Sequence, residues 1–253
     1  MNPQYPELRD LFYIFNGIGY TFQITIYRDI YEYLSDRAYS EAGFKEYPDI
    51  IHDVFQRSHL KEIIQQIQKI TNDTDDQVRI AVSLVQHIPY DHRKCIDEID
   101  FSPFFKIRSP YEVIYDSMGI CSEKSILLAF ILKELGYGTA LFSFNDERHM
   151  TVGIKAPKEY SFCNTGYAFI ETTIVSIINS FDNLNPFSLP GHGSIKIGSF
   201  PTIIIICDGA SFDTIFREFF DYEELKDIKN NHVHEGSTYY LMRYNELIQK
   251  YGL

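Results

Sequence analysis

The sequence predicts an α+β fold in which one buried helix packs against an antiparallel sheet. An apolar run at helical spacing covers residues 126–135 and follows closely after Cys121. The pattern then changes to that of β-strands in three successive segments, residues 139–144, 149–155 and 167–173. Strands that follow one another without a helix between them favour an antiparallel meander, and we expect the preceding helix to cover it.

A β-hairpin is predicted near the start of the chain. Asn16 and Gly17 separate two β-rich runs, residues 11–15 and 20–26. Asn-Gly between aromatic and β-branched residues is a strong signal for a tight hairpin turn. Apolar and polar side chains alternate in the second run, so we expect one of its faces to pack and the other to face water.

Four segments between the hairpin and Cys121 carry apolar residues at helical spacing or a clear helix start. Asp73 precedes one of them, and Pro110 follows Ser109 in the first turn of another. Residues 90–105, between these two helices, are predicted to form a loop. The predicted helical segments are residues 28–37, 50–70, 72–88 and 109–114.

The last part of the chain is predicted to complete the domain. Residues 181–198 are rich in Asn, Pro and Gly and are predicted to form a loop. Residues 201–206 form a continuous apolar run, which predicts a strand that is buried on both faces or covered at an edge. A final short helix is predicted over residues 243–250.

The composition argues against several classes of protein. The chain has 253 residues, a formal net charge of −12 and no basic cluster beyond Arg93 and Lys94, so we expect no nucleic-acid partner. The four cysteines form neither a disulfide framework nor a zinc motif, which favours reduced thiols in the cytoplasm. The longest uncharged stretch, residues 11–27, contains polar side chains, and no signal peptide is visible. We therefore expect a cytoplasmic protein that spans no membrane and needs no metal or other cofactor.

Cys121 is predicted to lie in the first turn of the buried helix. Gly119 allows a sharp turn before it, and Glu123 suits the positive end of the helix dipole. A thiol in this position faces unpaired backbone N–H groups, which favour the nucleophilic thiolate. The alternative is that Cys121 is only a small buried hydrophobic residue, as free cysteines often are.

A thiolate nucleophile needs a base, and the base needs an acceptor that orients it. His149 opens the second predicted strand, and Glu171 lies on the third. Both positions are odd, so the two side chains share a face if the strands pair odd with odd. A slip of one residue would place them on opposite faces. Asp146 is a competing orienting residue, but it lies in the turn before His149, which is a poor position for a bond between strands.

Several motifs occur together in an order that is fairly specific: a glycine and a cysteine at a helix start, a histidine that opens a strand, and an acid followed by threonine. They are found in residues 116–128, 135–137, 149–153 and 167–173, with support from residues 85–90. Together they resemble the core of the transglutaminase-like superfamily, in particular its uncharacterised prokaryotic members. The resemblance covers about residues 75–175.

This resemblance implies a papain-like cysteine fold with Cys121 as the nucleophile, His149 as the general base and Glu171 as the residue that orients the imidazole. The family more often has Asp in the last position, so Glu171 departs from the pattern by one methylene. The oxyanion would be stabilised by the backbone N–H of Cys121 and by a donor from the preceding helix, for which Gln86 is the candidate. An ordinary polar residue near a helix end is the alternative interpretation of Gln86.

The predicted function is cysteine-dependent acyl transfer on a peptide or glutamine carboxamide through a thioester on Cys121. Water as the acceptor makes the protein a peptidase or amidase, and an amine makes it a transglutaminase; we expect hydrolysis. The partner is then a protein or peptide substrate. The alternative is an inactive transglutaminase-like module that binds or acts as a scaffold. We expect the catalytic core in residues 75–180, flanked by an N-terminal extension (1–74) and a C-terminal extension (181–253).

Overall fold

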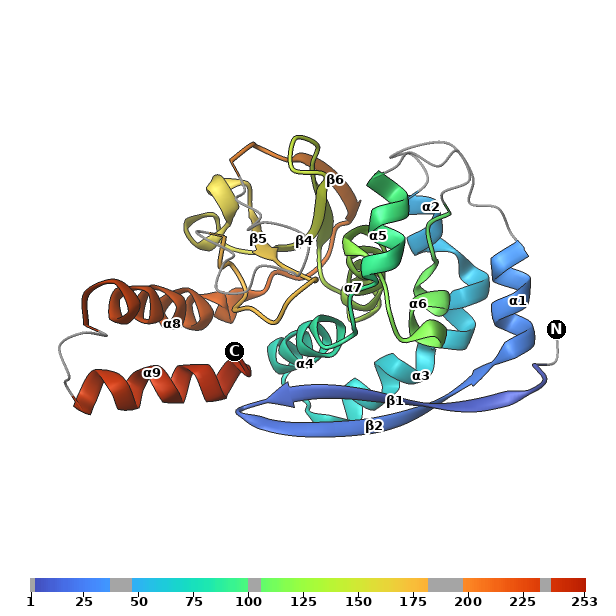
Figure 1. The fold of residues 1–253 in the computed structure, drawn as a ribbon, viewed down its shortest axis with the longest axis horizontal. Coiled ribbons are helices and arrows are strands. Elements are labelled where there is room, and N and C mark those ends of the chain that lie inside the picture. Colours follow the sequence, from blue (N-terminus) through green and yellow to red (C-terminus); the bar gives the residue numbers. More distant parts are fainter. Residues whose placement is uncertain (1–2, 37–46, 100–105, 182–197, 233–237) are drawn as a thin grey trace.

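The computed structural model describes residues 3–36, 47–99, 106–181, 198–232 and 238–253. It contains a two-stranded antiparallel sheet and a four-stranded antiparallel sheet, with helices between and around them (Figure 1). The predicted α+β class is therefore confirmed. In the described part of the chain, no helix is both long enough and apolar enough to cross a lipid bilayer.

The N-terminal hairpin forms as predicted and is longer than the sequence pattern indicated. It consists of β1 (Pro6–Phe15) and β2 (Ile18–Tyr27), which pair in a single register down to Phe15 and Ile18. Asn16 and Gly17 form the two-residue turn with φ angles of 51° and 77°. Positive φ at both positions matches the strand twist, and Asn and Gly tolerate it better than other residues do.

Four helices follow, and two aspartates fix where the longer ones begin. Asp53 accepts a hydrogen bond from Phe55 N at 2.8 Å and so divides the predicted helical segment 50–70 into two helices. Asp73 accepts from the backbone N–H groups of Asp75 and Asp76 in the same way. The four helices are α1 (Arg28–Asp36), α2 (Tyr47–His52), α3 (Val54–Ile70) and α4 (Thr74–Gln86).

The predicted loop over residues 90–105 is wrong in its first half, because α5 (His92–Ile99) lies there. Asp91 caps this helix: its Oδ1 accepts from Lys94 N at 3.0 Å. Residues 100–105 lie outside the described part of the chain. The next helix, α6 (Pro110–Asp116), starts as predicted with a capping box between Ser109 and Glu112.

The core of the molecule is α7 (Cys121–Glu134), which packs against the four-stranded sheet. Its residues are buried continuously from Cys121 to Leu132. The sheet has the strand order β5-β4-β3-β6, and all neighbouring strands are antiparallel. The predicted meander of three strands is confirmed. The strands are β3 (Thr139–Phe144), β4 (His149–Lys155), β5 (Tyr167–Ile170) and β6 (Thr202–Cys207), and the short helices η2 (Lys158–Tyr160) and η3 (Phe162–Asn164) connect β4 to β5.

The strand predicted over residues 201–206 exists, but its expected burial is wrong. It forms β6 at the edge of the sheet beside β3, and the side chain of Ile205 is 63% exposed. The loop predicted over residues 181–198 lies almost wholly outside the described residues.

The C-terminal part is more helical than the sequence indicated. It consists of η4 (Asp213–Ile215), α8 (Phe216–Asp227), a π-helical turn η5 (Ile228–His232) and α9 (Thr238–Tyr251). The predicted helix over residues 243–250 is therefore part of a longer one. Helices α8 and α9 lie side by side (Figure 1), and Arg243 on α9 donates to both carboxylate oxygens of Glu224 on α8.

Arg79 on α4 fastens the C-terminal helices to the core. Its Nε donates to Glu218 Oε1 at 2.5 Å, and its other nitrogens bind Asp76 Oδ1 at 2.9 Å and Thr214 Oγ1 at 2.8 Å. Glu218 is only 1% exposed, so Arg79 supplies the charge that allows this carboxylate to be buried.

Replacing Arg79 with leucine is expected to destabilise the protein by about 3–5 kcal/mol, because a buried carboxylate is left without its partner. Chemical denaturation with urea measures this loss. The control is Arg57→Leu, which breaks an ion pair whose arginine side chain is 58% exposed and which we expect to cost less than about 1 kcal/mol. Adding Glu218→Gln to Arg79→Leu should recover part of the loss. Equal losses for Arg79→Leu and Arg57→Leu would contradict the assignment.

Candidate active site

Cys121 is the first residue of α7, so its thiol lies at the positive end of the helix dipole. The residue is buried, with 6% of its surface exposed. The turn before it is held by a short parallel bridge between Gly119 and Tyr90, in which Gly119 N donates to Pro89 O at 3.2 Å and Gly119 O accepts from Asp91 N at 3.1 Å. For the backbone N–H of Cys121 no acceptor is found among the described residues, so this donor is available to a bound ligand.

The buried side chain of Glu123 fixes the start of α7. Its carboxylate is fully buried and accepts from Ile120 N at 3.1 Å, from Arg108 N at 2.8 Å and from Arg108 Nη1 at 3.2 Å. Lys94 on α5 donates to it as well. Two cations and two backbone donors therefore surround one carboxylate, and the helix start cannot shift without breaking this cluster.

His149 and Glu171 lie on the same face of the sheet, as odd-with-odd pairing predicts. Strands β4 and β5 pair with Val152 opposite Ile170, which makes His149 and Glu171 diagonal neighbours just beyond the last pair. Glu171 follows directly after β5 and is not part of it. His149 Nε2 donates to Glu171 Oε2 at 2.8 Å, and both side chains are 2% exposed. Glu171 thus holds the imidazole, and Asp146 in the preceding turn does not.

With Nε2 bound to Glu171, Nδ1 is the ring nitrogen of His149 that remains for Cys121, and the interaction with Cys121 helps to raise the pKa of His149. Burial opposes a charged imidazolium. The carboxylate of Glu171 and the contact with Cys121 outweigh burial and hold the pKa of His149 well above its ordinary value of 6.5. The arrangement therefore favours a protonated imidazole beside the sulfur.

Thr173 completes the environment of Glu171, and sequence reasoning assigned it no role. Glu171 Oε1 accepts from Thr172 N at 2.9 Å, Thr173 N at 2.8 Å and Thr173 Oγ1 at 2.6 Å. Burial raises the pKa of Glu171, but His149 and Thr173 outweigh it and lower the pKa to about 2. The pair of threonines after the acid is visible in the sequence and was the available signal for this contact.

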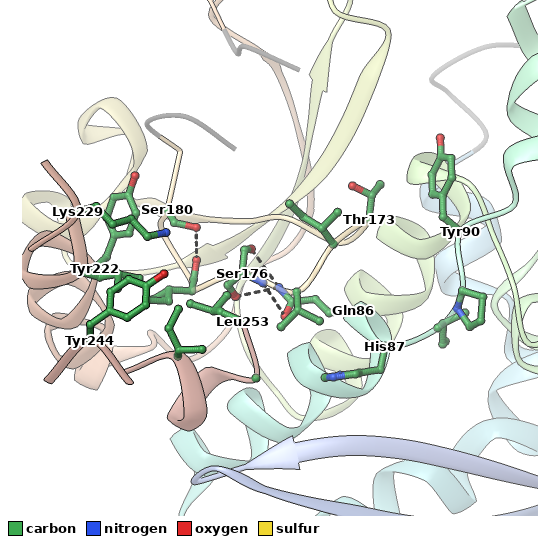
Figure 2. Close-up of a pocket in the computed structure, with 18 residues that line it drawn as sticks. Gln86, His87, Tyr90, Thr173, Ser176, Ser180, Tyr222, Lys229, Tyr244 and Leu253 are labelled. Atoms are coloured by element: carbon green, nitrogen blue, oxygen red, sulfur yellow. Dashed lines mark hydrogen bonds between the residues drawn. The ribbon is translucent and has the colours of Figure 1, made fainter. Parts of the chain in front are cut away.

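The structure does not support the predicted oxyanion role of Gln86. Its Nε2 donates to Glu171 O at 2.9 Å and to Ser176 O at 3.1 Å, as Figure 2 shows for the bond to Ser176. An amide nitrogen has two N–H groups, so neither is left for an oxyanion. Gln86 instead ties the end of α4 to the segment that follows β5, and so positions the backbone of Glu171.

Lys124 is a second residue that sequence reasoning missed. It is fully buried, one turn after Cys121, and its Nζ donates to Ile88 O at 2.6 Å and to Gln86 O at 3.3 Å. Burial lowers the pKa of Lys124 to about 7, although the charge of Glu171 opposes this. In the sequence Lys124 lies between Glu123 and Ser125 in a polar first turn, so no pattern there distinguishes it from an exposed lysine. It caps the end of α4 and fastens it to α7.

The donors and acceptors of this site do not form a metal centre. Within the residues that the structure describes, no group of three or more His, Cys, Asp or Glu side chains could hold a metal ion.

The pair of His149 and Glu171 predicts how stability depends on pH. Glu171, with a pKa of about 2 against an ordinary 4.5, contributes fully above about pH 4.5 and less as the pH falls towards 2. His149 contributes fully below about pH 6.5 and less as the pH rises through its higher folded value. The stability difference between the wild type and the double variant His149→Gln/Glu171→Gln should therefore be largest between about pH 4.5 and 6.5. Urea denaturation from pH 3 to 9 measures it, and a constant difference would refute the ion pair.

Comparisons with known proteins bear on the region that holds these residues. A family model described as a transglutaminase-like domain matches residues 58–172, which include Cys121, His149 and Glu171. A solved structure described as "Crystal structure of a TGase" is 14% identical, with 88% of this chain and 60% of that chain covered and a TM-score of 0.38. The chain thus spans about 60% of the length of that structure. No curated protein is significantly similar to the chain.

Proposed function

We propose that the protein catalyses cysteine-dependent acyl transfer, with hydrolysis of a peptide or carboxamide as its reaction, because residues 58–172 match the model of a transglutaminase-like domain. Cys121 is the nucleophile, His149 the general base and acid, and Glu171 the residue that orients the imidazole. The observation that carries the proposal is the arrangement of His149, whose Nε2 is bonded to Glu171 at 2.8 Å and whose pKa is raised by Glu171 and by Cys121.

The reaction begins when the Cys121 thiolate attacks the carbonyl carbon and His149 holds the thiol proton. The backbone N–H of Cys121 stabilises the oxyanion. When the C–N bond breaks, the amine takes the proton from His149 and leaves, and the acyl group remains on Cys121 as a thioester. His149 then removes a proton from water, which attacks the thioester and releases a carboxylic acid and the free thiol.

An amine in place of water would make the same thioester intermediate a step of transglutamination. We propose hydrolysis because water needs no binding site of its own, whereas an amine acceptor has to be bound and desolvated. A mixed peptide library, incubated with and without a biotinylated primary amine and read by mass spectrometry, tests this choice. New peptide termini or deamidated glutamine support hydrolysis, and incorporation of the amine in their place would overturn it. Cys121→Ala is the control for both products.

The second candidate is a module that binds without catalysis. The dense packing of the site, with 6% exposure at Cys121 and 4% at His149, is the observation that favours it, because a substrate carbonyl has little room to approach. The rate at which iodoacetamide labels the Cys121 thiol separates the two candidates.

A further inference from the structure

A cavity of about 750 Å³ lies between the catalytic core and the C-terminal helices (Figure 2). The core contributes residues 86–90 and 173–177, and the C-terminal part contributes residues of α8, η5 and α9. This volume is typical of sites for small organic ligands. Most of the wall is apolar, and the side chains that make it so include Ile88, Ile174, Val175, Ile177, Leu225 and Ile248.

One end of this cavity reaches the residues that hold Glu171. Thr173 lines it, and its hydroxyl donates to the carboxylate of Glu171 at 2.6 Å. Gln86 also lines it and donates to the backbone oxygen of Glu171 at 2.9 Å. Tyr90, which lies on the same side as Thr173 in Figure 2, is bridged to the turn that precedes Cys121. Cys121, His149 and Glu171 do not themselves line the cavity, but a ligand that fills this end contacts Thr173 and Gln86, which hold Glu171.

The opposite end is polar. Lys229, Ser180, Tyr222 and Tyr244 gather there (Figure 2). Lys229 is exposed to solvent, and its ammonium has no hydrogen bond or ion pair within the described part of the chain. Partial desolvation of its ammonium lowers the pKa of Lys229. A cation at the end of an apolar cavity, with hydroxyl groups around it, is complementary to a carboxylate at the end of an apolar ligand.

We propose that this cavity binds the carboxy-terminal end of a peptide with apolar side chains and that Lys229 binds the free carboxylate. The inference rests on the proposed function and names its substrate class. The scissile amide would then lie beyond the end formed by Tyr90 and Thr173, towards Cys121. Cys121 attacks its carbonyl carbon, the C–N bond breaks, and the bound fragment leaves as an amine that has taken the proton from His149.

Calorimetric titration of the full chain carrying Cys121→Ala tests this binding without turnover. The probes are an acetylated Leu-Leu-Phe peptide with a free carboxylate and the same peptide with a carboxy-terminal amide. We expect the free carboxylate to bind at least about tenfold more tightly. Lys229→Gln should remove this preference. Lys226→Gln is the matched control, since Lys226 lies three residues earlier, pairs with Glu223 and does not line the cavity, and it should keep the preference.

A second variant tests the apolar wall. Val175→Trp narrows the cavity and should weaken the binding of both peptides, and its fluorescence reports on folding because the chain has no other tryptophan. Equal affinity for the two peptides, an unchanged preference in Lys229→Gln, or tighter binding of dodecanoate than of the peptide would each overturn the inference. Carboxylate-dependent binding without turnover by the wild type would retain the binding site and refute the proposed catalysis. Turnover without a preference for the free carboxylate would retain the proposed catalysis and refute the binding site at Lys229.

Discussion

Replacing Cys121 with alanine is expected to reduce acyl transfer by at least about 10⁴-fold, because removal of the nucleophile leaves only binding and oxyanion stabilisation. The release of nitrophenolate from 4-nitrophenyl acetate measures this. The wild type should show a burst of about one equivalent per chain as the thioester forms, and Cys121→Ala should show none. His149→Ala should lose the burst as well, because the thiol then has no base beside it.

The other cysteines provide an internal control for the reactivity of Cys121. Cys163 is exposed, whereas only 6% of Cys121 is exposed. An unactivated thiol is alkylated according to its exposure, so Cys163 would react first with iodoacetamide at pH 6. We expect Cys121 to react faster, because it lies at a helix start and has the base His149 beside it. Peptide mapping identifies the labelled residue. If Cys163 is labelled first, the result favours the second candidate, a module that binds without catalysis.

Glu171→Gln is expected to lower kcat by about 10³–10⁴-fold while the structure around the site persists. Three donors from Thr172 and Thr173 converge on Oε1, so the amide oxygen of glutamine should occupy that position. The amide nitrogen then faces His149 Nε2, which has to accept a hydrogen bond. The imidazole proton is forced onto the nitrogen that faces Cys121, and the base cannot receive the thiol proton.

Thr173→Val is the matched variant for this prediction, because it removes one donor to Glu171 and keeps the carboxylate. We expect a loss of about tenfold, which corresponds to one hydrogen bond to a charged group. The burst rate and the steady-state rate, measured for both variants with the same ester, separate acylation from deacylation. Glu171→Gln with a rate within tenfold of the wild type would show that Glu171 has no role in orienting the base.

The parts of the fold that the sequence predicted are those with a local signal. Asn16-Gly17 predicted the hairpin turn, Asp73 and Ser109 predicted helix starts, and all three appear where expected. The shared face of His149 and Glu171 depended on register, and the parity of two positions was enough to predict it once the strands were known to be neighbours. Turn and capping residues, together with the alternation of side chains along the strands, thus predicted the elements that hold the site.

The parts that were missed are stabilised by contacts between distant residues. Helix α5 has no long apolar stripe, and it is held by Asp91 at its start and by Lys94, which reaches Glu123. The environment of Gln86 depends on a segment that begins 85 residues later in the chain. Contacts between residues so far apart in the chain leave no periodic pattern in the sequence. The sequence alone does not distinguish a polar residue near a helix end that faces a ligand from one that bonds to a backbone carbonyl.

The burial of Lys124 has a consequence for folding itself. Its pKa is about 7 in the folded protein and takes its ordinary value of 10.5 in the unfolded chain. Between these two values the unfolded chain carries a proton that the folded protein has given up, so this residue makes folding more favourable as the pH rises from 7 to 10.5. At pH 8 to 9, folding therefore releases a proton from Lys124 into the solvent. The lysine that joins α4 to the helix of Cys121 couples the assembly of the site to the release of a proton.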